Sequence, residues 1–204
     1  MLTGANIATE SILPRAWGYN ANDAKQVCAI HKIFGKRPLK TYPLSGLFKV
    51  YIYYPYILRM RVIKPLNLMP FNKDEAIEFL SKEFNWVYYG GKHYESRWTR
   101  FFQSYYLPVK FGYDKRRAHL ASLVLSGQKT REEALQELET PPYDEKSIQN
   151  DMEFIAKKLE ISVQELEALI KLPNKKFYDY PNNGWFEQLL HNIRAIARKI
   201  GIPF

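Results

Sequence analysis

Apolar and polar positions recur with helical spacing over much of the chain, most clearly in its last third. After a break at Pro141 and Pro142, successive apolar stripes spaced three or four residues apart predict a run of helices. The last stripe is the most regular and predicts a long amphipathic helix. Such stripes are far more often core or partner-helix contacts than ligand sites. Its apolar members are Phe186, Leu189, Leu190, Ile193, Ala197 and Ile200.

Polar residues that cap helices predict where several helices begin. Asp114 is expected to cap a helix that runs to about Ser126, with Gly127 as its terminator. Three further pairs have the capping-box spacing, in which an N-cap side chain is followed three residues later by Glu. These pairs are Asn72 with Glu75, Thr130 with Glu133, and Ser162 with Glu165.

The N-terminal segment, residues 1–70, gives a weaker pattern, in which short apolar runs mix with Gly and Pro. Asn22 is expected to cap a helix that Gly35 ends. Residues 48–60 are apolar and aromatic, so strand and helix both remain open there. Pro55 argues against an undisturbed helix in that run.

Length, charge and composition bound the class of protein. A chain of 204 residues with 46% apolar residues can bury a core, as one domain or as one domain with a helical extension. The formal net charge of +9 suits nucleic acid, phosphorylated small molecules or a solvated surface. The charge is spread along the chain without a basic tail, which weakens the nucleic-acid interpretation.

The location is predicted to be cytoplasmic. Cys28 is the single cysteine, so a disulfide within the chain and a thiolate metal cluster are both excluded. The longest apolar run, residues 49–59, is too short for a bilayer, which needs about 20 apolar residues. The first residues lack the basic and apolar regions of a signal peptide. We therefore expect no membrane span.

Three segments hold the residues that could carry chemistry. The first, residues 2–11, places Gly4, Asn6 and Glu10 after a short apolar entry, as at the ligand-binding end of a strand in an open α/β sheet. An ordinary N-terminal loop with a Thr or Asn cap explains these residues equally simply. One glycine is weak evidence, so spacing alone favours the loop.

The second segment, residues 88–100, is aromatic and contains paired glycines that let the backbone approach a ligand closely. It then combines donors, an acceptor and a titratable group. A turn followed by a salt-bridged helix start explains the pattern as well as a site does. The candidate residues are Lys92, His93, Glu95, Arg97 and Arg100.

The third segment, residues 110–119, places cations in the first turn of the predicted helix. Cations are unfavourable there because a helix N-terminus carries partial positive charge. A bound phosphate would reverse that sign, so we favour an anion site over pairing with distant acids. The candidates are Lys110, Lys115, Arg116 and Arg117.

Read together, these segments resemble the N-acetyl sugar amidotransferase family of bacterial surface-polysaccharide biosynthesis. The resemblance covers residues 1 to about 182. It rests on LTGANIATES, YYGGKHYESRWTRFFQ, LPVKFGYDKRRAHLASLVLSGQKTREEAL and PPYDEKSIQNDMEFIAKKL. It implies the C-terminal part of a doubly wound α/β domain of the ATP-pyrophosphatase superfamily, followed by a mostly helical extension. The implied divisions are 1–70 for the rest of the nucleotide-binding domain, 71–139 for a substrate-side helical region, and 140–204 for the extension.

The resemblance also implies an activity. ATP, with Mg²⁺, would activate an acetamido oxygen on a nucleotide-linked N-acetyl sugar of the O-antigen pathway, ammonia would attack, and an acetamidino group would form as AMP and pyrophosphate leave. Ammonia would come from glutaminase and cyclase-like subunits. By matching position, Gly4, Asn6 and Glu10 should face the nucleotide. Lys92, His93 and Glu95 should be catalytic, whereas Arg97, Arg100, Lys110, Lys115, Arg116 and Arg117 should bind substrate or phosphate.

The sequence departs from the family in one respect. The superfamily's Ser-Gly-Gly-x-Asp-Ser phosphate loop has no match here, so we expect a chain inactive alone that needs a missing N-terminal half. Three alternatives remain: a nucleic-acid-binding module, a tRNA-modifying relative of the same superfamily, and a non-catalytic assembly partner bound through the last stripe.

Overall fold

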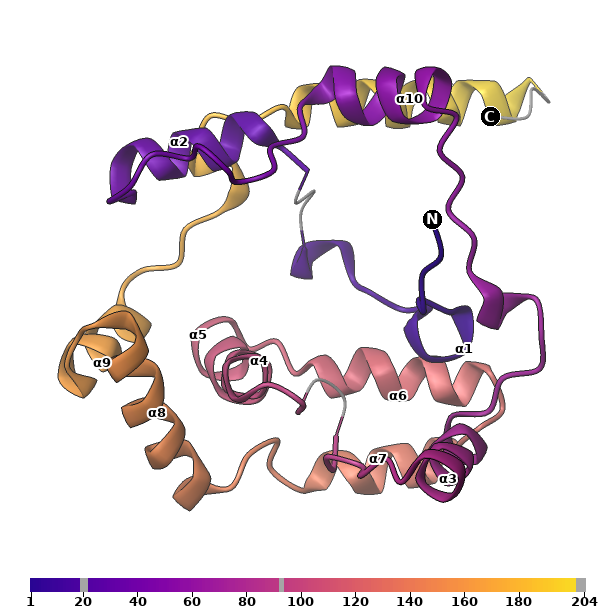
Figure 1. Cartoon of the computed structure of the whole chain (residues 1–204), viewed down its shortest axis with the longest axis vertical. Helices are drawn as coiled ribbons and strands as arrows, with labels where there is room; N and C mark the ends of the chain where they lie inside the picture. The colour runs from indigo at the N-terminus through magenta and orange to yellow at the C-terminus, as the bar shows by residue number, and fades with distance from the viewer. Residues whose placement is uncertain (19–21, 92–93, 201–204) are drawn as a thin grey trace. The chain divides into compact units, whose positions relative to one another are not determined.

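The computed structural model describes residues 1–18, 22–91 and 94–200, and these are mostly helical (Figure 1). Helices with 3₁₀ or π hydrogen bonding carry η labels. The elements are α1 (Ile7–Glu10), η1 (Arg15–Trp17), α2 (Ala24–Phe34), η2 (Lys49–Ile57), η3 (Pro65–Asn67), α3 (Lys73–Phe84), α4 (Arg97–Phe101), η4 (Phe102–Tyr106), α5 (Leu107–Phe111), α6 (Lys115–Leu125), α7 (Arg131–Glu139), α8 (Glu145–Leu159), α9 (Val163–Lys171), η5 (Phe177–Asp179) and α10 (Gly184–Lys199).

The predicted doubly wound α/β fold is wrong. Within the described ranges, β-pairing is limited to one isolated parallel bridge between Leu2 and Ile63, and there is no sheet. The physical reason lies in the N-terminal segment 1–70, where prolines interrupt or end several of the short apolar runs. Within residues 48–60, which had been open between strand and helix, Lys49–Ile57 form the π-helix η2, and Pro55 lies inside it.

The chain divides into two compact units, each assembled from segments far apart in the sequence. The first unit comprises residues 1–18 and 62–174. The second unit comprises residues 19–61 and 175–204, of which 22–61 and 175–200 are described. The divisions predicted at residues 70 and 139 stay a prediction.

The main core of the first unit lies where α4 packs on α8 and α8 packs on α9. The apolar stripe of α8 is buried at Ile148, Met152 and Ile155, whereas Leu159 at the end of the helix is 44% exposed. Tyr105 and Tyr106 of η4 pack against the same cluster. The buried members are Phe101, Ile148, Met152, Ile155, Ala156, Leu166 and Ile170.

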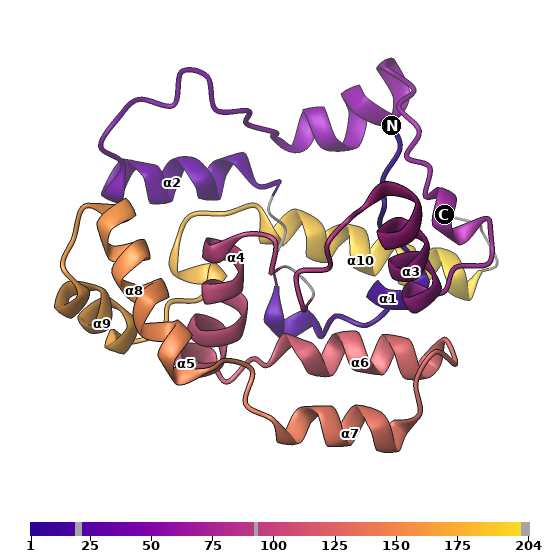
Figure 2. The ribbon, with the colours of Figure 1, turned by 60° about the horizontal axis from the view of Figure 1, so that its bottom comes forward.

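A second cluster holds α6 and α7 together as a helical hairpin (Figure 2). Asp114 caps α6 by accepting from the Arg116 backbone N–H at 3.0 Å, which confirms the predicted cap. Gly127 follows the helix with a φ of 70°, a left-handed conformation that favours glycine. Thr130 begins α7 with the predicted capping box, and Ser162 does the same for α9.

The segment from α4 through η4 to α5 is one helical run with a π-helical middle. Pro108 has no N–H to donate to the carbonyl four residues earlier. In the preceding turn, the Leu107 N–H donates to the carbonyl of Phe102, five residues back. The wider turn changes the direction of the side chains, and Ser104 of η4 is buried.

The two segments of the second unit are held together at the start of α2. Asp23, rather than the predicted Asn22, caps α2 by accepting from the Lys25 and Gln26 backbone N–H groups. Asp23 also accepts from the backbone and side chain of Asn183 at 2.6 and 2.9 Å. None of the described helices combines the length and apolar character that a bilayer crossing requires.

Candidate functional site

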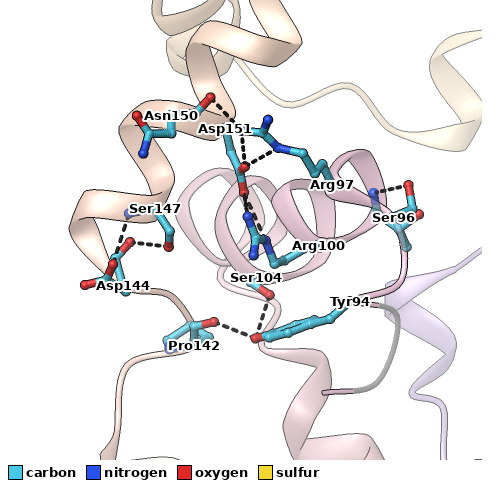
Figure 3. Close-up of polar contacts among 11 residues, drawn as sticks. Tyr94, Ser96, Arg97, Arg100, Ser104, Pro142, Asp144, Ser147, Asn150 and Asp151 are labelled. Atoms are coloured by element: carbon cyan, nitrogen blue, oxygen red, sulfur yellow. Dashed lines mark hydrogen bonds and ion pairs between the residues drawn. The ribbon is translucent and has the colours of Figure 1, made fainter. Parts of the chain in front are cut away.

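Arg97 and Arg100 both point at one buried carboxylate, that of Asp151 on α8 (Figure 3). Arg97 Nε donates to Oδ1 at 2.9 Å. Arg100 donates to Oδ2 through Nε at 3.0 Å and through Nη2 at 2.6 Å. Because only 1% of the Asp151 side chain is exposed, the carboxylate needs these cations to compensate for its burial. The two arginines thus tie α4 to α8.

Arg97 makes two further contacts with α8. Its Nη2 donates to the carbonyl of Asn150 at 3.0 Å, and its guanidinium lies 4.4 Å from the centre of the Phe154 ring. These contacts give Arg97 a structural task independent of any substrate. Its predicted substrate role, like that of Arg100, stays a prediction.

A pocket of about 340 Å³ opens elsewhere in the first unit. It lies among four segments: the Gly-Gly loop, η4, the start of α6 and the end of α7. The lining residues mix cations, carboxylates, aromatic rings and backbone. They are Lys73, Tyr88, Gly90, Gly91, Tyr94, Gln103, Ser104, Asp114, Lys115, Arg116, His119, Leu120, Leu123, Glu137, Thr140, Pro141 and Pro142.

Arg116 connects the start of α6 with the end of α7. Its Nη2 donates to Asp114 Oδ2 at 2.7 Å, so the two side chains neutralise each other. Its Nη1 donates to the carbonyls of Glu137 and Thr140 at 3.3 and 2.8 Å. These last carbonyls of α7 are where a cation is favoured by the helix dipole. Arg116 therefore shapes one wall of the pocket.

Lys115 is the cation that remains available at this helix terminus. Its side chain is half-buried in the pocket wall and forms no hydrogen bond or ion pair with the described residues. The neighbouring Arg117 is exposed and is absent from the lining. With Arg116 balanced by Asp114, Lys115 and the N-terminal turn of α6 give this wall a positive potential.

Tyr94 also lines the pocket and is held by two hydrogen bonds (Figure 3). Its hydroxyl donates to the carbonyl of Pro142 at 3.0 Å and accepts from Ser104 Oγ at 3.2 Å. The ring lies so close to Gly91 that a Cβ there would approach it to 2.9 Å. Gly90 has a φ of 85°, which favours glycine. Gly91 thus permits the close approach to the ring, and Gly90 permits the left-handed turn of the loop.

Tyr88 adds a hydroxyl to the pocket that stays protonated at neutral pH. Partial burial raises the pKa of Tyr88 above its ordinary value, and the carboxylates of Asp74 and Glu137 raise it further. A protonated phenol can donate a hydrogen bond and present a flat ring to a sugar or base.

His119 lines the pocket although the sequence did not single it out as a site residue. It lies one helical turn after Lys115 on α6, and both of its ring nitrogens are buried. The four-residue spacing from Lys115 was the signal that could have identified it, because residues i and i+4 share a helix face. Tyr88, Ser104 and Glu137 gave no such signal, because tertiary contacts bring them here.

Lys110 lies outside the pocket and already has three acceptors. Its Nζ donates to the carbonyls of Leu169, Ile170 and Leu172 at 3.2, 2.9 and 2.8 Å. These carbonyls lie at the C-terminal end of α9, where a cation is favoured. Its predicted contact with phosphate stays a prediction, and we do not include Lys110 in the candidate site.

The predicted nucleotide-facing residues lie at the short helix α1. Asn6 caps it by accepting from the Thr9 backbone N–H at 2.9 Å, and its Nδ2 donates to the carbonyl of Gly4 at 3.3 Å. This is the arrangement expected of an ordinary capped loop. Glu10 is exposed at the end of α1. None of the three lines the pocket.

The remaining predicted residues flank the Gly-Gly loop. Lys92 and His93 lie outside the described residues. Glu95 is exposed just before α4 and is absent from the pocket lining. The pocket therefore brings together the second and third candidate segments, through Gly90, Gly91, Lys115 and Arg116, without the first.

A family model described as "LPS biosynthesis protein WbpG-like, C-terminal domain" matches residues 95–194. Residues 95–194 are a WbpG-like C-terminal domain. This confirms the predicted resemblance to the C-terminal part of a surface-polysaccharide biosynthesis family, and it gives the chain a role in lipopolysaccharide biosynthesis. Searches of curated proteins and of solved structures returned no match.

The WbpG-like domain contains most of the pocket. It includes Ser104, the start of α6 with Lys115 and His119, and the end of α7. The Gly-Gly loop lies immediately before its first residue. It also contains the Arg97–Arg100–Asp151 cluster and therefore the main core of the first unit.

Proposed function

We propose that the first unit binds the nucleotide-linked N-acetyl sugar for an ATP-dependent amidotransferase that converts an acetamido group to acetamidino. The observation that carries the proposal is the pocket at the N-terminus of α6, which lies mostly within the WbpG-like domain. In the proposed reaction, the acetamido oxygen is adenylated by ATP and pyrophosphate is released. Ammonia then attacks the carbon that carries this oxygen, and the oxygen leaves with AMP.

The charge of the pocket suits a diphosphate. The ammonium group of Lys115 would hold its oxygens, and the dipole of α6 favours a negative group at this end of the helix. Asp114 does not cancel this potential because Arg116 already pairs with it at 2.7 Å. The volume of about 340 Å³ lies near the lower end for small-molecule sites, so it fits the sugar and diphosphate better than a whole sugar nucleotide.

The other pocket residues suit the sugar. Tyr88 and Tyr94 offer ring faces, and Gln103 and Ser104 offer polar groups to sugar hydroxyls. Histidine is the side chain that most readily exchanges a proton near neutral pH. His119 would therefore act as the general acid or base when ammonia replaces the oxygen. Lys92, His93 and Glu95 remain proposed catalytic residues by resemblance.

Mg²⁺ and the ATP triphosphate are not assigned to residues of this chain. Mg²⁺ prefers carboxylate and water oxygens. Among the residues described, no group of three or more His, Cys, Asp or Glu side chains is placed to hold a metal ion. The described residues therefore do not fit such a site. The ammonia-supplying glutaminase and cyclase-like subunits likewise stay proposals.

A binding measurement tests the proposal without requiring turnover. Calorimetric titration of the chain with UDP-N-acetylglucosamine should show binding that Lys115→Ala weakens by roughly tenfold or more, because a charged hydrogen bond is lost. Lys146→Ala, which removes an exposed lysine of the same unit, should bind like the unaltered chain. RNA competing for the same site would favour a tRNA-modifying relative instead. Equal affinity of Lys115→Ala and the unaltered chain would sink the proposed site.

A further inference from the structure

The net positive charge of the chain belongs to one of its two units. The second unit contains 13 of the 30 Lys and Arg residues but only 3 of the 21 Asp and Glu residues, giving it a formal charge of +10. The first unit holds the other 17 basic and 18 acidic residues, which leaves it at −1. The charge of the whole chain is therefore not a property of the substrate pocket, which lies in the first unit.

The three acidic residues of the second unit are too few to balance its 13 basic residues. Asp23 is 4% exposed and is occupied by the N-terminus of α2 and by Asn183. Asp179 accepts from the Lys176 backbone N–H at 2.8 Å. Burial raises the pKa of the Tyr51 phenol, and the nearby charge of Glu187 on α10 raises it further. The accessible surface is thus strongly basic.

Only one side of the apolar arc of helix α10 packs within this unit. On one side of the arc Ala197 is buried, and Phe186 contacts the ring of Tyr51 at 5.0 Å between centroids. The other side forms an exposed stripe spaced by four, four, three and four residues. The members of this stripe, between 39% and 64% exposed, are Trp185, Leu189, Ile193, Ile196 and Ile200.

The same helix carries exposed cations beyond its apolar arc. Arg194, Arg198 and Lys199 lie on the C-terminal half of α10, and each is exposed. A basic amphipathic helix with aliphatic residues and a tryptophan on its apolar face is typical of a helix that lies in the plane of a membrane surface.

We propose that the second unit binds the surface of an anionic lipid bilayer, with the exposed stripe of α10 entering the boundary of headgroups and acyl chains. The unit's charge of +10 complements acidic headgroups. Four of the five stripe residues are aliphatic. Aliphatic side chains gain from entering lipid but cannot stack on bases, which argues for a bilayer over RNA. The contact is peripheral and independent of the proposed pocket.

Vesicle co-sedimentation tests the proposal with the full chain. The chain should sediment with vesicles of phosphatidylglycerol and phosphatidylcholine and should stay in solution with phosphatidylcholine alone. Added salt should weaken the binding, because it screens the headgroup attraction. Absence of binding to the anionic vesicles, or equal binding to both kinds, would overturn the proposal.

Two variants separate the apolar and the electrostatic contributions. Ile196→Glu should lower vesicle partitioning by roughly tenfold or more, because it places a carboxylate where an isoleucine enters the lipid. Leu125→Glu is the matched control, since Leu125 is 71% exposed on α6 of the first unit and Ile196 is 60% exposed. The control should partition like the unaltered chain. Equal partitioning of both variants would contradict the assignment of the stripe.

The charge variant remains informative if Ile196→Glu fails to fold. Arg194→Gln with Arg198→Gln should reduce partitioning by roughly 25-fold, since each cation near an anionic surface contributes about fivefold. Lys146→Gln with Lys171→Gln, both exposed in the first unit, should change it less than about twofold. A loss of RNA binding in the α10 pair without any lipid effect would assign the surface to nucleic acid and overturn the proposal.

Discussion

At the scale of single residues, the same side-chain type serves different tasks in neighbouring positions. Lys115 faces the pocket, Arg116 closes it by pairing with Asp114, and Arg117 is exposed. The sequence predicted an anion site at this helix start because cations there oppose the helix dipole. It could not distinguish the three cations, because the carbonyls that Arg116 contacts at the end of α7 lie far along the chain.

Asp151 provides the sharpest stability prediction at this scale. Asp151→Asn should lower the free energy of unfolding by about 2–3 kcal/mol, because two guanidinium groups lose their compensating charge inside the main core. The loss is smaller than for a fully buried pair since both arginines are partly exposed. Urea unfolding would measure it. Glu153→Gln, on an exposed position of the same helix, should shift stability by less than about 0.5 kcal/mol. Equal effects of the two substitutions would contradict the account.

Lys110 separates structural cations from ligand-binding ones. Lys110→Met should destabilise the chain by about 1–2 kcal/mol, because three carbonyls at the end of α9 lose their donor. It should leave the affinity for UDP-N-acetylglucosamine unchanged. Thermal unfolding and calorimetric titration of the same variant give the two values, with the exposed Lys171→Met as the control. A large loss of affinity at unchanged stability would return Lys110 to the phosphate site.

At the scale of elements, helix starts were the most predictable feature of the chain. Asp114, Thr130 and Ser162 each cap the helix that their local sequence predicted, because a cap is satisfied within three residues. The N-terminal segment 1–70 was not predictable in the same way. Its apolar runs satisfy neither period clearly, and the outcome depended on Pro55 and on packing within each unit.

The capping boxes predict a pH dependence of stability. The pKa of Glu133 lies below its ordinary value of 4.5, mainly because the backbone N–H of Thr130 donates to its carboxylate. A hydrogen bond with the Thr130 side chain lowers the pKa further. The pKa of Glu165 is lowered in the same way by Ser162. A lowered folded pKa means that the stabilisation is present above about pH 4.5 and is lost as pH falls through the folded value.

Alanine variants measure this contribution. Glu133→Ala and Glu165→Ala should unfold at lower urea concentration than the unaltered chain at pH 7, and the difference should narrow as pH falls below about 4.5. Glu167→Ala, on the exposed face of α9, is the control and should show no such narrowing. A difference that stays constant with pH would mean that the carboxylates do not act through these caps.

At the scale of the whole molecule, the structure separates two properties that the sequence presented together. The pocket and the WbpG-like core belong to the first unit, whereas the excess basic charge belongs to the second. Net charge alone had suggested phosphate or nucleic acid for the entire chain. The units could not be read from the sequence, because each joins segments that lie far apart along the chain and their boundaries carry no local signal.

The central claim is that the nucleotide-linked sugar binds at the start of α6, and amide chemical shifts test it most directly. Titration of the isotope-labelled chain with UDP-N-acetylglucosamine should perturb the amides of Lys115, Arg116 and His119 together with those of Tyr88 and Tyr94. The amides of α1 and α10 should not respond. Perturbations centred on Gly4 to Glu10, with α6 silent, would contradict the account and return the nucleotide to the N-terminal segment.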